Sequence, residues 1–217
     1  MKKIISIILA LTTMCALFAG CNLGNNKPTE PVVTEARTIE NVMIYPESPA
    51  EDFNVSTQDG DTILYGYSGD DEIVVIPESL GVTHIAKFAF ANSTAFKAIR
   101  LSNSIQYIEE GAFADNNDIE LVICGSGVKE IGISAFQDCD NLTRVVLNDG
   151  LVKIERMVFT GSRFMSSVEI PSTVEEIAMA AFHETIDGFF LVGEAGSYAE
   201  EYAKEYEIPF KVKEIDG

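Results

Sequence analysis

Residues 128–150 read VKEIGISAFQDCDNLTRVVLNDG, and this stretch decides the fold because its pattern recurs along the chain. Its phenylalanine and its first isoleucine each return every 23 residues without a slip. A fixed period of this size is typical of a repeat solenoid. The two columns are Phe90, Phe113, Phe136, Phe159 and Phe182, and Ile85, Ile108, Ile131, Ile154 and Ile177.

Other apolar columns keep the same step. No single coil can bury its columns alone, so each coil must stack on the next. We therefore expect five coils over residues 82–193, with the phenylalanines as a structural ladder. Two of the further columns are Val82, Ile105, Val128, Leu151 and Val174, and Ile99, Val122, Val145, Val168 and Leu191.

Alternating apolar residues near the end of each coil, as in Leu142–Leu147, predict a short strand. Stacked coils would pair these strands into a parallel sheet, with one strand about every 4.8 Å. A second extended piece is expected near Val128–Ile131, and a short helical or irregular turn before each phenylalanine. The expected fold class is a repeat solenoid, mainly β with short helical turns.

Two segments resemble a known family. Ile131–Cys139 has the form Ile-x-x-x-Ala-Phe-x-x-Cys, and Glu169–Ile177 is similar to a Leu-Pro-x-Ser-Val-x-x-Ile link. Both resemble the BspA-like leucine-rich repeat proteins, over roughly residues 53–212. The resemblance implies a leucine-rich-repeat-like fold and a bacterial surface protein used in adhesion or protein contact, and it implies no catalytic residues. The asparagine column of ordinary leucine-rich repeats is missing, and only Cys139 occupies the cysteine column.

The N-terminus has the form of an export signal. Lys2 and Lys3 precede an apolar run, and Cys21 follows Ala19 and Gly20 in a sequence similar to a bacterial lipobox. We expect residues 1–20 to be a lipoprotein signal peptide and Cys21 to be the lipidation site of a membrane-anchored lipoprotein on the cell surface. A retained membrane helix and an ordinary cleaved signal are the alternatives.

The flanks of the repeats are expected to differ from them. Residues 21–52 are predicted to be a lipid-anchored cysteine and a flexible tether, because Asn, Pro, Thr and Glu prevail there. Residues 53–81 are predicted to be an N-terminal β cap, with strands at 62–67 and 73–76 and a turn between them. Residues 194–217 are predicted to be a helix-strand cap, opened by a capping box at Ser197 and Glu200.

Charge limits the choice of partners. The chain has 15 Lys and Arg against 34 Asp and Glu, for a formal net charge of −19. Such a surface disfavours nucleic acid and anionic membranes, which bind basic faces. We expect a monomer with a protein ligand, and contact with membrane only through the lipid anchor.

No residue pattern in the sequence predicts a catalytic, cofactor-binding or metal-binding site. His84 and His183 lie in different repeats without partners at metal spacing, and no nucleophile motif or phosphate loop is present. We expect no enzyme activity, no cofactor and no metal site. Cys124 and Cys139 are expected to be buried thiols, with a disulfide as the alternative. Asp115 and Asp138 share a column. We interpret them as solvated residues of turns rather than as ligands of a calcium ion.

One strand face carries more apolar residues than a solvated strand needs. We expect a candidate protein-binding face there, because exposed apolar and Arg residues mark protein contacts. The alternative is that a turn, the C-terminal cap or the far wall covers these side chains. A second alternative is a structural or spacer envelope lipoprotein without a dedicated ligand. The candidate residues are Leu121, Ile123, Arg144, Val146 and Phe190.

Overall fold

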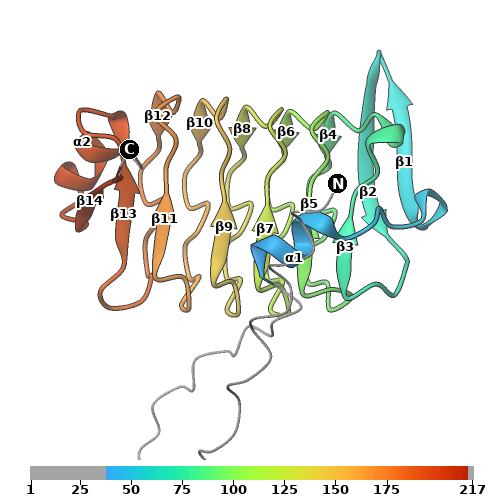
Figure 1. Ribbon diagram of the computed structural model, residues 1–217, viewed down its shortest axis with the longest axis horizontal. Coiled ribbons are helices and arrows are strands. Elements are labelled where there is room, and N and C mark those ends of the chain that lie inside the picture. Colours follow the sequence, from blue (N-terminus) through green and yellow to red (C-terminus); the bar gives the residue numbers. More distant parts are fainter. Residues whose placement is uncertain (1–37, 215–217) are drawn as a thin grey trace, which may run out of the picture.

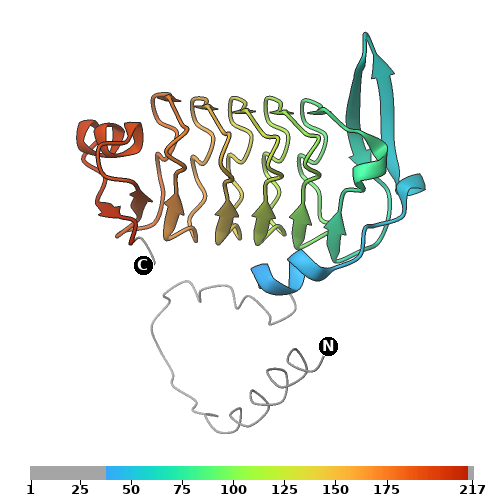
Figure 2. The same cartoon turned by 45° about the horizontal axis from the view of Figure 1, so that its top comes forward.

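The structure is a computed structural model that describes residues 38–214. The chain winds into a solenoid whose coils stack along the long axis of the molecule, with a cap at each end (Figure 1). Two walls of short strands run along it, which Figure 2 shows from a second side. The solenoid predicted from the 23-residue period is therefore confirmed.

The first wall, here called the long wall, is a seven-stranded sheet in the order β1-β2-β4-β6-β8-β10-β12. Its strands are parallel except for the β1–β2 hairpin. Their bounds are β1 Phe53–Gln58, β2 Asp61–Tyr67, β4 His84–Ile85, β6 Tyr107–Ile108, β8 Glu130–Ile131, β10 Lys153–Ile154 and β12 Glu176–Ile177.

The second wall consists of two separate parallel sheets and is here called the split wall. One sheet has the order β3-β5-β7-β9 and the other β11-β13-β14. Their bounds are β3 Ile73–Val75, β5 Ala98–Arg100, β7 Leu121–Ile123, β9 Arg144–Val146, β11 Ser167–Glu169, β13 Phe190–Gly193 and β14 Phe210–Val212.

The phenylalanine column forms a stacked ladder between the two walls. Consecutive ring centroids lie 5.0 to 5.5 Å apart, and the rings are within 14° of parallel. All five side chains are at most 4% exposed. The isoleucine column is equally buried, and it lies in register along the long wall, as Ile108 with Ile131. Both columns were predicted correctly.

Two further columns adopt left-handed backbone conformations that turn the chain around the phenylalanine. Asp115 and Asp138 belong to one of them, with φ of 56° and 53°. Asp and Asn tolerate this region better than most residues, because their short polar side chains can bond locally. A backbone requirement therefore accounts for this aspartate column. The columns are Phe88, Gly111, Ser134, Met157 and Ala180, and Asn92, Asp115, Asp138, Gly161 and Glu184.

The column that contains Cys139 forms a ladder of side-chain donors. Asn116 Nδ2, Cys139 Sγ and Ser162 Oγ each donate to the backbone carbonyl of the phenylalanine in the preceding coil, over 3.1 to 3.3 Å. All three residues are fully buried. A buried carbonyl needs a partner, so this position requires a small donor rather than a particular residue. Cys124 and Cys139 are both free thiols.

The N-terminal cap differs in part from the expectation. The predicted strands are present as β2 and β3, but they lie in opposite walls and are not paired with each other. β2 instead pairs with β1, a strand that the sequence reading missed. β3 already occupies the strand position of a repeat, because Val74 is in register with Ile99. A short 3-10 helix, η3 (Glu78–Leu80), supplies the extra residues before the first coil.

The C-terminal cap contains the predicted helix and strand. Helix α2 (Tyr198–Glu205) covers the last coil with Ala199, Tyr202 and Ala203, all buried, and β14 follows. The predicted capping box is wrong in detail. The Glu200 carboxylate accepts from the N–H of Gly196 at 2.6 Å rather than from Ser197, and the Ser197 side chain makes no cap bond.

The predicted tether is wrong from Thr38 onward. Helix α1 (Ile39–Ile44) and the 3-10 helix η2 (Ala50–Asp52) are ordered segments of the fold. Between them, buried Ser48 exchanges two hydrogen bonds with the backbone of Val75, at 3.0 and 3.1 Å. The predicted signal peptide, Cys21 and the first part of the tether lie outside the described residues, as do residues 215–217. No helix within 38–214 is long and apolar enough to cross a membrane.

Candidate binding face on the split wall

The outward side chains of the split wall come from the first and third residues of its short strands. Parallel register aligns them from coil to coil, as Leu121 with Arg144 and Ile123 with Val146. The middle residue of each strand points inward and joins the core, as Val122 and Val145 do. All five predicted face residues therefore lie on one surface, here called the outer face. They are spread over β7, β9 and β13.

Helix α1 covers the N-terminal half of the outer face. Val42 is fully buried in a small apolar cluster, and the cluster includes Leu121 and Ile123, which are 2% and 4% exposed. Arg100 Nη2 also donates to the carbonyl of Tyr45, just past the helix, at 3.3 Å. The predicted residues Leu121 and Ile123 are thus inaccessible while α1 is in place. Figure 1 shows α1 in front of β5 and β7, and Figure 2 shows it beside the same row of strands.

The cover is a segment that the sequence reading did not consider. A turn, the C-terminal cap and the far wall were the expected covers, but α1 lies in the segment predicted to be a tether. One local signal was present, since Thr38 caps the helix by accepting from the N–H of Asn41 at 3.4 Å. A six-residue helix is too short to be stable by itself in water. Its formation depends on the sheet that it covers.

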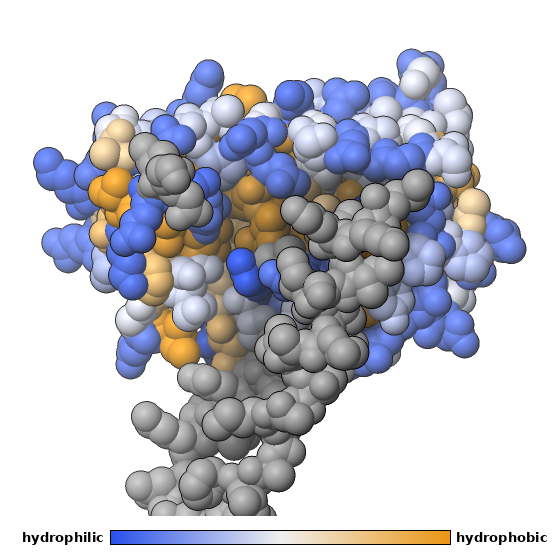
Figure 3. All heavy atoms as spheres, in the orientation of Figure 1, coloured by the Kyte–Doolittle hydropathy of each residue, from blue (hydrophilic) through white to orange (hydrophobic). Residues whose placement is uncertain are grey.

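The C-terminal half of the outer face is open. Arg144 is exposed, and Val146, Phe190 and Val192 are half-buried. Phe190 is partly shielded by a cation, because Lys211 Nζ lies 3.4 Å from the centre of its ring. Such a contact stabilises modestly at exposed sites. Figure 3 shows hydrophobic residues in the middle of this side of the molecule and hydrophilic residues along its rims.

A hollow of about 580 Å³ lies on this open half, between β9 and β11. Val145 and Leu147 contribute apolar surface to it, and Ser166, Ser167 and Ser172 contribute hydroxyl groups. Its charged rim consists of Arg144, Asp149, Glu169, Glu194 and Lys213. Hollows of this size hold small ligands or short segments of a partner chain.

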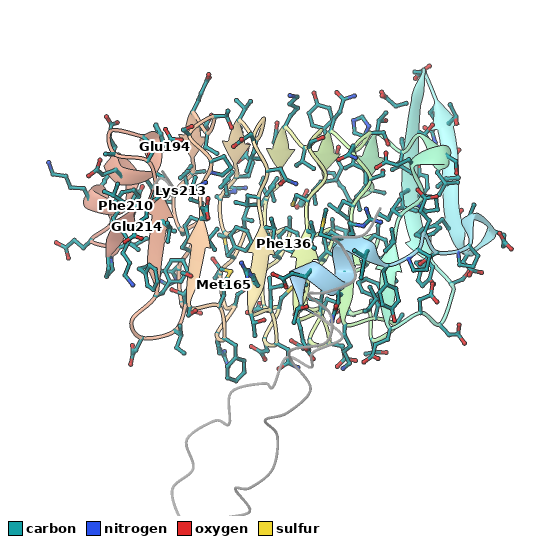
Figure 4. All side chains as sticks on the ribbon, in the orientation of Figure 1. Phe136, Met165, Glu194, Phe210, Lys213 and Glu214 are labelled. Carbon is teal, nitrogen blue, oxygen red and sulfur yellow. The ribbon has the colours of Figure 1, made fainter. Side chains whose placement is uncertain are left out.

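Lys213 forms an ion pair on this rim. Its ammonium lies 2.6 Å from a carboxylate oxygen of Glu169. The hydrogen bond to Glu169 and the charges of Asp149 and Glu194 raise the pKa of Lys213 above its usual value. Figure 4 shows Lys213 and Glu194 at the C-terminal end of the face. The rim of the hollow therefore has three carboxylates, of Asp149, Glu169 and Glu194, and two cations, of Arg144 and Lys213.

The remaining polar groups were also compared with the geometry that a metal ion needs, for residues 38–214. No cluster of three or more His, Cys, Asp or Glu side chains is placed to hold a metal ion there. His84 is partly buried rather than exposed, stacks on Tyr107 at 4.7 Å and contacts the Thr83 hydroxyl at 2.9 Å. Burial raises the pKa of the Cys124 and Cys139 thiols to about 12, which removes them as nucleophiles.

Residues 65–187 match the family model described as BspA type leucine-rich repeat region, in six copies. A search of curated proteins gave no match.

Several solved structures are similar, and two bacterial proteins are among them. The leucine-rich repeat protein of T. pallidum is 27% identical, with a TM-score of 0.63 over 68% of this chain and 71% of that one. The pneumococcal vaccine antigen PcpA is 19% identical, with a TM-score of 0.53 over 69% of this chain and 43% of that one.

Proposed function

Because this chain belongs to the BspA-type leucine-rich repeat family, we propose that it is a cell-surface protein whose solenoid binds another protein. Solenoids of this kind supply extended surfaces for binding, built from the same position of successive coils. The family relation supports an extracellular or surface location, and a binding role rather than a catalytic one. We further propose that the chain is a lipoprotein anchored through Cys21 and that the binding serves adhesion to host or bacterial partners.

The observation that carries the binding role is the open half of the outer face. A strand face that only contacts water would carry polar side chains, as the long wall does at Glu130, Lys153 and Glu176. The outer face instead presents Val146, Phe190 and Val192 beside a hollow with a charged rim. Apolar side chains surrounded by polar ones are the usual composition of a protein interface.

The competing function is a spacer in the cell envelope. A spacer needs only the stacked core and the anchor, so its outer face would have no partner. The two functions differ in what they predict for substitutions on that face. A charge placed there should abolish binding in the first case and have no functional effect in the second.

The test is a binding measurement on the purified chain against host matrix proteins and against whole bacteria. Val192→Lys places a charge at the edge of the hollow, and Val152→Lys makes the same change at an exposed position elsewhere. We expect a partner to be found, and Val192→Lys to weaken its binding by about tenfold or more. Val152→Lys should bind like the parent. Absence of any partner would favour the spacer, and equal binding of both variants would place the interface elsewhere.

A further inference from the structure

Each of the two walls has an edge strand at both ends of the solenoid, and three of these four edges are protected within residues 38–214. Helix α2 lies against β12, and the backbone of Val75 in β3 is bonded to Ser48 at 3.0 and 3.1 Å. Strand β14 is only three residues long and carries Lys211. A cover, a short length and a lysine are means by which proteins keep an edge strand from pairing with another chain.

Strand β1, at the fourth edge, has none of these protections. It is six residues long, reads FNVSTQ, and contains neither a charged residue nor a proline. Its residues 54 and 56–58 are exposed. Within the described part of the chain, β1 pairs with β2 alone. Figures 1 and 2 both show it as the outermost strand of the long wall, in a hairpin whose tip extends beyond the other strands.

The main-chain groups of Val55 and Thr57 face the open side of β1. In β2, the carbonyls of Thr62 and Leu64 accept hydrogen bonds of 2.8 Å from the residues on either side of β4, so they face away from β1. Directly opposite residues of an antiparallel pair either bond to each other or both face away from each other. Val55 lies opposite Leu64, and Thr57 lies opposite Thr62. The N–H and C=O groups of Val55 and Thr57 are therefore available to a further strand.

The N-terminal cap that carries this edge is strongly acidic. Residues 38–86 contain ten Asp and Glu residues and no Lys or Arg. The next two lysines along the chain are ion-paired with carboxylates of the repeats, at 3.0 and 3.3 Å. Carboxylates flank β1 at both ends, with Glu51 and Asp52 before it and Asp59 and Asp61 at the turn. A cationic partner complements this charge.

A second copy of the chain fits the same edge poorly. If two β1 strands paired antiparallel about their centres, Asp52 of one copy would lie opposite Asp59 of the other, because Phe53 would pair with Gln58. Like charges directly opposite each other destabilise a strand pair. A partner strand with Lys or Arg at its two ends would instead meet a carboxylate at each end.

We propose that the free edge of β1 is a second protein-binding site, at which an extended basic segment of a partner adds a strand to the long wall. The segment matches the six residues of β1 in length and carries Lys or Arg at both ends. Its main chain bonds to Val55 and Thr57. The site lies in the opposite wall from the outer face, so it goes beyond the proposed function and does not depend on it.

The first test is hydrogen exchange on the unmodified full chain. The Val55 and Thr57 amides should exchange much faster than the Ser56 amide, because Ser56 faces β2. Equal rates for all three amides would overturn the proposal, since the edge would then be either covered or not held in place by the hairpin.

The second test uses a phage-displayed library of short random peptides, selected on the full chain. Thr57→Pro removes an outward N–H and obstructs a further strand, and proline is tolerated where an edge N–H faces solvent. Thr57→Ala is the matched control. It also loses the contact of 3.3 Å between the Thr57 and Thr62 hydroxyls, but it keeps the N–H.

We expect the selected peptides to carry Lys or Arg on both sides of a run of β-branched or aromatic residues. They should bind Thr57→Pro about tenfold or more weakly than the parent, because main-chain bonds are lost. Thr57→Ala should bind like the parent. Selection of no peptide, peptides without basic residues, or equal binding to the parent and Thr57→Pro would overturn the proposal.

A second variant leaves the strand itself unchanged. Glu51→Gln with Asp59→Asn removes one carboxylate beside each end of β1, and Asn tolerates the left-handed backbone of Asp59, with φ of 52°. Glu175→Gln with Glu201→Gln removes the same charge at exposed positions near the other end of the solenoid. Peptide binding should weaken about threefold or more in the first variant, and less at high salt. Equal weakening in both variants would overturn the site.

Val192→Lys separates this site from the outer face. It should leave peptide binding unchanged, because Val192 lies in the split wall. Peptides that lose binding to Val192→Lys but not to Thr57→Pro would lie on the outer face. The proposed function would then stand, and the β1 edge site would be wrong.

Discussion

A single phenylalanine side chain in each coil fills the space between the two walls. Phe136 is fully buried, with Phe113 and Phe159 stacked at 5.0 and 5.5 Å on either side of its ring. Figure 4 shows it inside the central coils. The coils cannot close around a missing ring without losing strand register, so a cavity would remain.

Phe136→Ala should therefore lower the free energy of unfolding by about 3–5 kcal/mol, through lost burial and the remaining cavity. The measurement is the denaturant midpoint of the purified protein. Glu175→Ala changes an exposed side chain and should leave the midpoint almost unchanged. Equal midpoints for the two variants would contradict the stacked ladder.

At Ala180, we expect the effect of a substitution on stability to depend on backbone conformation rather than on side-chain contacts. Ala180 has φ of 61°, at a position where an equivalent coil has Gly111. The left-handed region costs a residue with a Cβ about 1–2 kcal/mol, whereas glycine loses about 0.5–1 kcal/mol through its freedom in the unfolded chain. Ala180→Gly should therefore raise the thermal midpoint slightly.

The neighbouring Ala181 is the control, because it is fully buried and has no positive φ. Ala181→Gly should lower the midpoint, since it loses packing and gains unfolded-state freedom. Shifts of the same sign in both variants would show that the left-handed column does not determine these positions.

The buried thiols of Cys124 and Cys139 make the folding stability of the protein depend on pH under alkaline conditions. Burial raises the pKa of Cys124 and Cys139 from an ordinary 9.0 to about 12. Their contribution to stability is complete below about pH 9 and declines as the pH rises toward 12, because only the unfolded state releases the proton readily.

Iodoacetamide at pH 8 should leave both residues unmodified in the folded protein and alkylate both in urea, as read by mass spectrometry of their peptides. Rapid alkylation of either residue in the folded state would mean that its coil opens locally.

Among the elements, α1 connects stability with access to the outer face. It is held by Val42, which is fully buried, whereas the adjacent Met43 is 51% exposed. Burying a valine contributes about 1.5–3 kcal/mol, so Val42 is a substantial part of what attaches this helix. Its release would expose Leu121 and Ile123 and enlarge the apolar part of the candidate binding face.

Val42→Asp should detach α1 while the solenoid stays folded. We expect faster proteolysis between residues 38 and 48 and stronger binding of a hydrophobic dye, with the main unfolding transition retained. Met43→Asp adds the same charge one residue further along the helix. It should change neither the rate of proteolysis nor the binding of the dye. If Val42→Asp unfolds the whole chain, α1 is an integral part of the fold rather than a cover.

For the molecule as a whole, the anchor remains a prediction, because Cys21 lies outside the described residues. Cys21→Ser should abolish incorporation of labelled fatty acid and release the protein from the membrane fraction. A lipid chain holds a protein by the burial of its methylene groups, and serine cannot take the same modification. A serine variant that still partitions with membranes and is processed normally would contradict the lipoprotein hypothesis.

The structural features that could be predicted from the sequence are those that recur in every coil. Phe136 and Ile131 have the same surroundings as Phe113 and Ile108, since each coil meets a copy of itself above and below. A local 23-residue pattern therefore carries the information for the long-range contacts. The face of the candidate site followed from the same alternation, which correctly placed Leu121 and Arg144 on one surface.

Features that occur only once in the molecule could not be predicted from the repeat pattern. Helix α1 is short and has no repeat to reveal it, and its position depends on the apolar surface that the assembled sheet offers to Val42. The missing pairing between β9 and β11 leaves no trace in the pattern, because Val145 and Val168 keep their core columns on either side of it. The sequence by itself determined the coil and its stacking, because these depend on local spacing. Only the tertiary structure decided where the outer face is covered and where it opens, because both depend on how completed coils pack against each other and against the chain that precedes them.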